Sequence, residues 1–392
     1  MAHRAACAVT EPSRSRAYVF PALIGLGILN HTVLTGSRVT ISLYALSLGS
    51  STFVVGTLMG LYAFLPMLLA VAAGRLTDRI GLRKPMLVGS CGVAIAAALP
   101  CFVSGIAPLF VTTALLGISF MLFQLATQNA TGLFGHPSER AKHFAMLAMG
   151  YSVSGFCGPL VSGLTIDHAG FAGTFALLAL LPLIPVGILS WNLLKLPGPR
   201  PVAEDSAPGG VAVLFRNRHL RRVFIVNALL AVAWDLHSFF IPIYGATIGL
   251  SASRIGVILA AFAAATFIVR LFMGWIARRV SEFEVLAAAL FVAATAYALF
   301  PFVKEVGPLI ALSFALGLAL GCAQPMVMSL LHNIAPAGRM GEAVGVRMSI
   351  INASTFAMPL LFGAVGSTLG LAPVFWSIGA ALAGGGFFAR RR

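Results

Sequence analysis

The sequence predicts an all-α membrane protein with 12 transmembrane helices arranged as two parallel-repeat six-helix halves, and three observations lead to this prediction. Only 9% of the 392 residues are charged and 59% are hydrophobic, whereas a soluble domain carries roughly 25% charged residues. The charged residues leave long apolar runs between them. Many glycine, proline and polar residues also recur at one constant offset. This composition excludes a soluble globular domain and a disordered chain.

The apolar runs are long enough to cross a membrane, because a helix needs about 20 apolar residues to span a bilayer core of about 30 Å. No Asp, Glu, Lys or Arg occurs in the 54 residues of 85–138, the 42 residues of 348–389 or the 33 residues of 306–338. Glycine, proline and charged clusters divide these and the other runs. The predicted spans are 18–38, 53–73, 85–104, 108–131, 143–165, 171–193, 222–244, 254–274, 283–302, 308–331, 343–365 and 371–389.

The positive charges are asymmetric along this series of spans. With the N-terminus inside, 21 of the 26 Lys and Arg residues fall on inner segments, and Arg254 and Lys304 are the two on outer loops. Since short cytoplasmic loops attract Lys and Arg, both termini are expected to be cytoplasmic. The net charge of +15 is then a mark of topology, and no nucleic-acid partner is needed to explain it.

Polar composition divides the chain into five parts. Residues 194–221 form the long polar stretch between the halves, and its prolines and glycines are typical of a linker. We expect a cytoplasmic N-terminal segment, an N-terminal half, a cytoplasmic linker, a C-terminal half and a cytoplasmic tail at 1–17, 18–193, 194–221, 222–389 and 390–392, respectively.

An internal repeat relates the two halves at an offset of 200 residues. The coinciding pairs include Tyr44 and Tyr244, Pro108 and Pro308, Gln124 and Gln324, and Pro159 and Pro359. A run of such pairs at one offset indicates two six-helix halves with the same orientation. In transporters with parallel repeats, the substrate site lies near the membrane midplane between the halves.

The loop after the second span, 74–85, reads GRLTDRIGLRKP. It resembles the signature loop of the major facilitator superfamily, G-x-L-x-D-R-x-G-R-[KR]-[KR], with Leu82 where Arg is usual. The resemblance implies the major facilitator fold and a latch between the halves that stabilises the outward-open state. A loop that only sets membrane topology is the alternative. The latch residues are Gly74, Asp78, Arg79, Gly81, Arg83 and Lys84.

The fifth span resembles the G-x-x-x-G-P-x-x-G-G motif of drug:proton antiporters in this superfamily. Small residues allow close helix packing and the proline bends the helix. Ser154 and Ser162 replace two glycines, Pro359 echoes the kink in the other half, and Thr113 stands where these antiporters usually carry an arginine. An antiport-specific device and a general kink of the fold therefore both remain open. The predicted helix-kink residues are Gly155, Gly158, Pro159 and Gly163.

Asp235 is the carboxylate placed deepest in a predicted span. An ionisable residue at membrane depth is expensive and marks a functional site by default. Protonation removes that cost, so we predict Asp235 as the proton-coupling residue. A structural ion pair with Arg38 or Arg347 is the alternative.

The other polar residues within spans are candidates for a substrate cavity, because the resemblance implies a cavity lined by the first, fourth, seventh and tenth helices. Helix-to-helix hydrogen bonding is the alternative for the neutral groups, packing is the alternative for Trp234, and snorkelling to the membrane surface is the alternative for Arg347. A structural role is favoured for Arg270. The predicted cavity residues are Asn30, His31, Arg38, Gln124, Gln128, Trp234, His237, Gln324, Arg347 and Asn352.

These features predict a secondary transporter, and no catalytic motif or P-loop indicates an enzyme. We expect proton-coupled export of a small organic molecule by a monomer in the bacterial inner membrane, with small molecule, protons and lipid as partners and no cofactor or metal. Proton-coupled uptake of an organic anion or metabolite is the first alternative, and a receptor or scaffold without flux is the second. Copper transport, suggested by Met326, Met328 and His332, is the weakest because their spacing does not bring three ligands together.

Overall fold

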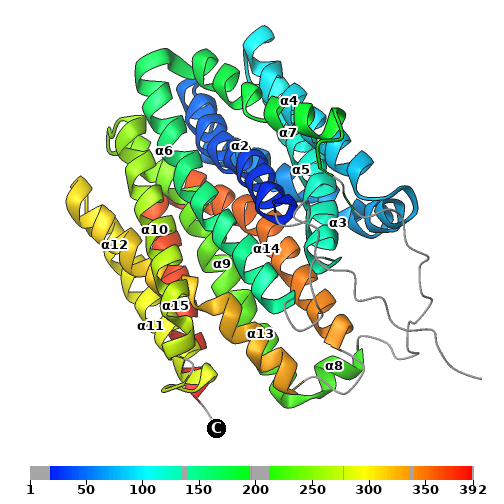
Figure 1. Cartoon of the computed structure of the whole chain (residues 1–392). Helices are drawn as coiled ribbons and strands as arrows, with labels where there is room; N and C mark the ends of the chain where they lie inside the picture. Colours follow the sequence, from blue (N-terminus) through cyan, green and yellow to red (C-terminus); the bar gives the residue numbers. More distant parts are fainter. Residues whose placement is uncertain are drawn as a thin grey trace, which may run out of the picture.

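The computed structural model describes residues 18–133, 140–194, 196, 212–276, 278–334 and 340–390, and over these ranges the chain is helical without strands. Figure 1 shows the helices as one bundle, with the helices of the two halves side by side. The first half contains α2 (Val19–Ser47), α3 (Thr52–Ile80), α4 (Arg83–Phe102), α5 (Ala107–Leu133), α6 (Arg140–Leu180) and α7 (Leu183–Ser190).

The short helix α8 (Ala212–Arg216) precedes the second half. The second half contains α9 (Arg218–Thr247), α10 (Ala252–Ile276), α11 (Glu282–Leu299), the short 3-10 turn η2 (Phe300–Phe302), α12 (Val306–Gly321), α13 (Ala323–Ile334), α14 (Met340–Leu369) and α15 (Leu371–Arg390).

Twelve membrane crossings follow from these helices. In the described residues, 11 segments are long and apolar enough to cross a membrane. One of them, His143–Ser190, has 48 residues and is broken at Gly170, whose φ of 69° and ψ of −177° are not helical. A positive φ costs glycine little, so the chain turns there and crosses twice. The predicted tenth span is also interrupted, because α12 ends at Gly321 and α13 begins at Ala323.

Polar side chains start several helices by accepting hydrogen bonds from the free N–H groups of the first turn. At α9, the Asn217 side chain accepts hydrogen bonds from the backbone N–H groups of His219 at 2.9 Å and Leu220 at 3.2 Å. At α11, Ser281 and Glu284 form a reciprocal capping box. These caps fix the helix starts after the polar connections of the second half.

The offset of 200 residues is realised in the packing of helices within each half. A Cβ atom added at Gly117 would lie 2.3 Å from the Tyr62 carbonyl oxygen, and one added at Gly317 would lie 2.3 Å from the Phe262 carbonyl oxygen. Only a glycine permits such an approach. The crossing of α3 and α5 in the first half therefore has its equivalent in the crossing of α10 and α12 in the second half.

The halves pack against each other at the end of the bundle where α3 and α10 begin. A Cβ at Gly56 would lie 2.2 Å from the Pro359 carbonyl oxygen, and one at Gly256 would lie 2.5 Å from the Pro159 carbonyl oxygen. The Thr52 hydroxyl also donates to the Gly363 carbonyl at 3.1 Å. We call this the closed end. The opposite end, where α4 begins at Arg83 and α15 finishes at Arg390, is the basic end.

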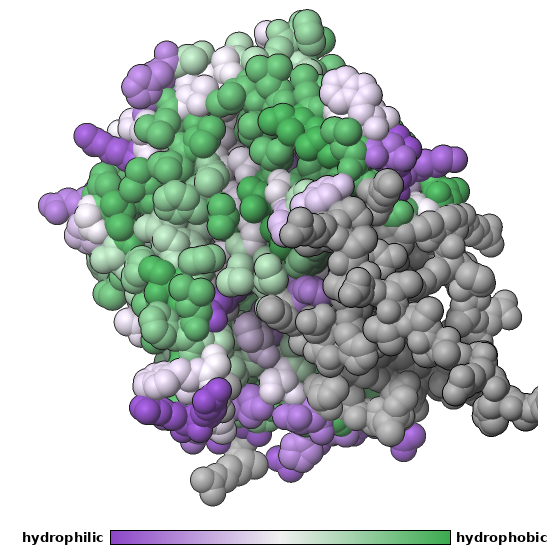
Figure 2. Space-filling model, in the orientation of Figure 1, coloured by the Kyte–Doolittle hydropathy of each residue, from purple (hydrophilic) through white to green (hydrophobic). Residues whose placement is uncertain are grey.

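The surface of the bundle is apolar around its middle. Figure 2 shows hydrophobic residues over much of the coloured surface, with hydrophilic residues in a band at the lower end and in smaller groups at the upper and side edges. Large apolar side chains within the helices are exposed on this surface, including Ile95 of α4 at 64% and Val292 of α11 at 43%. Together with the 11 helical segments of membrane-spanning length and hydropathy among the described residues, this broad apolar surface indicates contact with lipid.

Candidate functional site

Asp235 lies in the middle of α9 and accepts two hydrogen bonds from the neighbouring helix α14. The Ser354 hydroxyl donates to its Oδ2 atom at 3.2 Å and the Thr355 hydroxyl at 3.0 Å. Both donors are 119 to 120 residues away in the sequence. Helix α14 thus supplies hydrogen-bond donors that the carboxylate would otherwise take from water.

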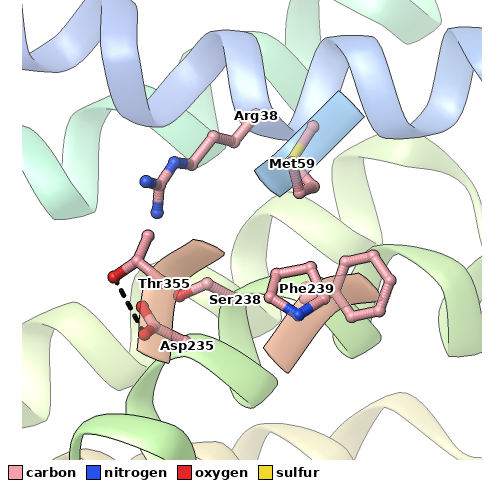
Figure 3. Close-up of a pocket in the computed structure, with 7 residues that line it drawn as sticks. Arg38, Met59, Asp235, Ser238, Phe239 and Thr355 are labelled. Carbon is pink, nitrogen blue, oxygen red and sulfur yellow. Dashed lines mark hydrogen bonds between the residues drawn. The ribbon is translucent and has the colours of Figure 1, made fainter. Parts of the chain in front are cut away.

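Arg38 faces this carboxylate from the other half of the molecule. Figure 3 shows its guanidinium extending from α2 toward Asp235 and Thr355. A gap of about 10 Å³ lies between them, also lined by Met59, Ser238, Phe239 and Pro359, which is room for about one water molecule. The Arg38 Nε atom is buried without a hydrogen-bond partner, and the guanidinium lies 5.4 Å from the Tyr62 ring centre. Arg38 and Asp235 therefore face each other across the interface between the halves.

A larger cavity of about 190 Å³ opens on the other side of Asp235. Its polar lining comes from Asn227, Trp234, Arg270, Gln324 and Arg347. Its apolar lining is formed by Leu230, Ala231, Leu320, Ala323 and Ile351. Asn227 and Arg347 lie nearer to the basic end of their helices than Asp235 and Thr355 do. Asp235 thus separates this cavity from the small gap beside Arg38.

Arg347 is inside the protein, although its position near the start of α14 also suited a surface role. Its side chain is 6% exposed, and its Nε atom donates to the Asn227 Oδ1 atom at 3.1 Å. A second contact joins its Nη1 atom to the Met348 sulfur at 3.9 Å. The structure places this guanidinium in the cavity wall.

Arg270 joins the two halves and lines the same cavity. Its Nη1 atom donates to the Ser152 hydroxyl at 2.6 Å and to the Ala148 carbonyl at 3.2 Å, both on α6. The sequence favours a structural role for Arg270, and its bonds to α6 fit that role. Arg270 also lines the larger cavity, a position that was not predicted from the sequence.

Three of the predicted cavity residues make helix-to-helix hydrogen bonds within one half. Asn30 donates to Ser90 at 3.1 Å, His31 is bonded to Ser154 at 2.5 Å, and His237 is bonded to Ser313 at 3.1 Å. His237 is 1% exposed and stacks on Phe262 with 4.3 Å between ring centres. The structure therefore joins these three residues to neighbouring helices and does not bring them to either cavity.

The remaining predicted cavity residues divide into two groups. Trp234 and Gln324 line the larger cavity. Gln124, Gln128 and Asn352 are half-buried and are not among the residues that line either cavity described above. The repeat-equivalent pair Gln124 and Gln324 thus does not share one site.

The predicted latch loop is only partly described. The side chains of Gly74, Asp78 and Arg79 lie outside the described residues. Gly81 ends α3 with a φ of 83° and Lys84 is exposed. Arg83 donates to the Leu189 and Ser190 carbonyls, each at 2.7 Å, at the end of α7. These described bonds lie within the first half, so a latch between halves stays a prediction.

The predicted helix-kink motif packs on two different helices. A Cβ at Gly158 would lie 2.8 Å from the Thr32 carbonyl oxygen on α2, and one at Gly163 would lie 2.4 Å from the Ala252 carbonyl oxygen on α10. Gly155 is looser, with 3.7 Å to Ala263. The carbonyl oxygen of Pro159 is the atom that a Cβ added at Gly256 would approach. The motif therefore forms part of the closed end.

Sequence reasoning missed Asn227, Ser354 and Thr355. Asn227 is a single polar residue in an apolar run, and Ser354 is the repeat equivalent of Ser154, so both carried a weak signal. As for metals, the described residues contain no group of three or more His, Cys, Asp or Glu side chains that could hold an ion. The His332 side chain lies outside the described residues.

Comparison with known proteins identifies the family. The family model described as Major Facilitator Superfamily matches residues 23–306 and 223–392. The chain belongs to the major facilitator superfamily. It is therefore a multi-pass membrane transporter and not an enzyme.

Curated relatives within this superfamily include proteins named for efflux and resistance. The chain is 29% identical over 205 residues to the multidrug efflux pump LfrA of Mycolicibacterium smegmatis, a match covering 51% of this chain and 38% of that protein. It is 26% identical over 346 residues to the class D tetracycline resistance protein of Salmonella ordonez, covering 84% of each. The sequence-based resemblance to the drug:proton antiporter group is consistent with both.

Solved structures show the same fold. A POT family transporter in complex with a thioalcohol-conjugated peptide superposes with a TM-score of 0.79 at 15% identity, covering 94% of each chain. A POT family transporter in complex with 5-aminolevulinic acid gives a TM-score of 0.78 at 15% identity, again covering 94% of each chain. At this identity the likeness establishes the major facilitator fold alone.

Proposed function

We propose that this transporter couples proton movement to the export of a small organic molecule, with Asp235 as the proton-binding residue. The observation that carries the proposal is the position of Asp235 between the interface gap that holds Arg38 and the 190 Å³ cavity. A residue in that position faces Arg38 of the first half and also lines the larger cavity. Its charge state then affects both how the halves pack and what the cavity binds.

Two charge states of Asp235 give two different interfaces. When ionised, the carboxylate accepts the bonds from Ser354 and Thr355 and attracts Arg38 across the gap. When protonated, it loses that attraction and can donate a hydrogen bond of its own. An equilibrium between two packings of the halves can be shifted only by such a difference in interaction free energy. Proton binding at Asp235 supplies it.

Alternating access requires that one end of the bundle opens while the other closes. We infer that the closed end faces outward and the basic end faces the cytoplasm, because Lys and Arg are concentrated on cytoplasmic segments. Both termini and the linker 194–221 are then cytoplasmic, between halves at 18–193 and 222–389. The cavity between Asp235 and the basic end is the substrate site in this arrangement, and the loop at Gly81 to Lys84 contributes to the latch when the opposite end opens.

The direction of transport is supported by the relatives. One is named a multidrug efflux pump and the other a tetracycline resistance protein. We assign the chain on this basis to export across the bacterial inner membrane, as a monomer. Proton-coupled uptake of an organic anion is the second candidate, since Arg270 and Arg347 outnumber Asp235 in the cavity.

Flux through proteoliposomes separates these functions. The purified full chain is reconstituted with an imposed pH gradient, and uptake of a panel of radiolabelled drugs, organic anions and organic cations is followed. Export predicts substrate movement opposite to proton movement, and the uptake alternative predicts movement in the same direction. If no gradient drives flux of any compound, while the protein still binds one of them, the receptor alternative replaces the proposal.

A further inference from the structure

The 190 Å³ cavity is rich in hydrogen-bond donors and poor in acceptors. Two guanidinium groups, those of Arg270 and Arg347, line it together with one carboxylate, that of Asp235. Arginine is always charged and carries five donor N–H groups and no acceptor. With Asp235 ionised, these charged side chains sum to one positive charge, and with Asp235 protonated they sum to two.

Neither arginine is neutralised by a carboxylate of the described residues. Arg347 donates to the neutral Asn227 amide and contacts the Met348 sulfur. Arg270 donates to the Ser152 hydroxyl and the Ala148 carbonyl. Buried charges in proteins are normally paired, because an unpaired ion away from water is costly. Arg347 is buried and Arg270 is half-buried, so two guanidinium groups without a carboxylate partner in one cavity indicate a ligand of opposite charge.

The Asn227 side chain adds a second, independent indication. Its Oδ1 atom accepts the bond from Arg347, while its Nδ2 atom is buried and has no hydrogen-bond partner. A buried donor without a hydrogen-bond partner is costly. Asn227 thus presents an unused N–H donor beside the Arg347 guanidinium.

Asp235 does not compensate for this excess of donors. Its Oδ2 atom already accepts hydrogen bonds from Ser354 and Thr355. It also faces the third arginine, Arg38, across the interface gap. Its Oδ2 atom is therefore occupied by α14, and even the ionised carboxylate leaves one positive charge in excess among the charged side chains of the cavity.

The rest of the cavity wall is apolar. Leu230, Ala231, Leu320 and Ile351 form it, with the indole of Trp234 beside them. The cavity has room for on the order of ten water molecules, which limits the size of the occupant. A ligand that fits has one acidic group and a compact apolar body.

We propose that this cavity binds small organic anions, with the acidic group held by Arg347 and the Asn227 amide and attracted by Arg270, and the apolar body against Trp234 and Leu320. The inference rests on the proposed transport function only in treating this cavity as the substrate site. Carboxylates, sulfonates and phosphate monoesters share the required chemistry, and guanidinium groups bind all three through paired N–H donors.

Equilibrium binding tests the proposal without any gradient. The purified full chain in lipid nanodiscs is titrated calorimetrically with benzoate, benzenesulfonate and phenyl phosphate, and with benzamide and benzylamine as neutral and cationic compounds of the same shape. At least one anion is expected to bind about tenfold more tightly than both controls. Arg347→Gln is expected to weaken that anion about tenfold, and Asn227→Leu is expected to weaken it less. These factors correspond to about 1.4 kcal/mol for each tenfold change.

Matched variants separate binding from folding. Arg347→Lys keeps the charge and is expected to retain part of the affinity, and Arg278→Gln removes an exposed arginine at the basic end and is expected to change nothing. Thermal unfolding of each variant shows whether it is folded. The proposal is overturned if benzamide or benzylamine binds as tightly as every anion, if no anion binds, or if folded Arg347→Gln binds the anion as the wild type does.

The outcome is distinguishable from failure of the proposed function. Anion binding that depends on Arg347, without proton-driven flux, leaves this inference standing and removes proton-coupled export. Proton-driven export of a cation, without anion binding, does the reverse.

Discussion

Thr35 and Asp235 occupy equivalent positions in the two halves, and each is bonded to the equivalent partner helix. The Thr35 hydroxyl donates to the Ser154 carbonyl on α6 at 3.0 Å, and Asp235 accepts from the Ser354 hydroxyl on α14 at 3.2 Å. The repeat therefore preserves the contact between helices while the chemistry differs. In the first half this place is neutral, and in the second half it is ionisable.

The same division extends to the surroundings. His31, Thr35 and Ser154 bond to one another across α2 and α6, whereas Asp235 lies between a cavity and a gap. Arg38 is the contribution of the first half, and its repeat equivalent Ser238 lines the same gap. Both halves thus share the same helix packing, and the proposed coupling depends on the charge of Asp235, which has no charged equivalent in the first half.

Among the variants that test the comparison of the two halves, the largest effect is expected at the close helix crossings that both halves share. Gly256→Val places a side chain against the Pro159 carbonyl, and overpacking costs typically 1–3 kcal/mol, enough for a decrease in flux of about tenfold or more. Gly56→Val, at the equivalent crossing with Pro359, should behave alike. Gly25→Ala, with no atom within 4 Å of an added Cβ, is the control. Unequal effects at Gly56 and Gly256 would break the equivalence of the two crossings.

Arg38 tests whether the first half takes part in coupling. Arg38→Gln removes the positive charge that faces Asp235, and proton-driven flux is expected to fall by about tenfold, the effect of losing about 1.4 kcal/mol of interaction. Arg38→Lys should recover much of it. Flux is measured in proteoliposomes under a fixed pH gradient. Equal loss in both variants would show that shape, not charge, is what matters at this position.

Asp167 marks a difference between the halves at the closed end. Its carboxylate accepts hydrogen bonds from the Ala252 N–H at 3.1 Å and the Ser253 N–H at 2.8 Å, at the start of α10. Asp167→Asn removes a negative charge from this helix N-terminus, which costs about 0.3–1 kcal/mol. We expect the closed end to open more often, as reported by distances between spin labels on α3 and α14. The equivalent change Ser367→Ala should leave those distances unchanged, and an equal shift would contradict the assigned role.

The smallest effect on transport is expected at His31. His31→Ala loses the hydrogen bond to Ser154, which lowers the unfolding free energy by about 1 kcal/mol. Flux should stay close to wild type, because this cluster joins α2 to α6 within the first half. The comparison uses a thermal melt and a flux assay on the same preparation. A loss of proton coupling with normal stability would place a proton site in the first half as well.

The fold was predictable from the sequence because its signals are simple. The membrane spans are the long stretches without charged residues. Residues 200 positions apart, such as Gly117 on α5 and Gly317 on α12, make equivalent contacts. The site was less predictable. Asp235 stood out as a buried carboxylate, but its partners Ser354 and Thr355 depend on how α14 is rotated against α9.

The same dependence on rotation explains the other differences. His31 and His237 are polar residues within spans, and the sequence could not show that Ser154 and Ser313 bond to them. For Arg347 the sequence leaves two positions open, the cavity and the membrane surface. Its hydrogen bond to Asn227 places it in the cavity wall. Polarity in a span identifies a candidate, and only tertiary packing decides whether it faces a cavity or a neighbouring helix.

The most direct test of the central claim is Asp235→Asn in two assays on one reconstituted preparation. The asparagine can still accept hydrogen bonds from Ser354 and Thr355, so the fold and substrate exchange without a gradient should persist. Flux driven by the pH gradient should be abolished, and the matched change Glu305→Gln in an exposed loop should have no effect. Gradient-driven flux at the wild-type level in Asp235→Asn, at every pH measured, would contradict the account.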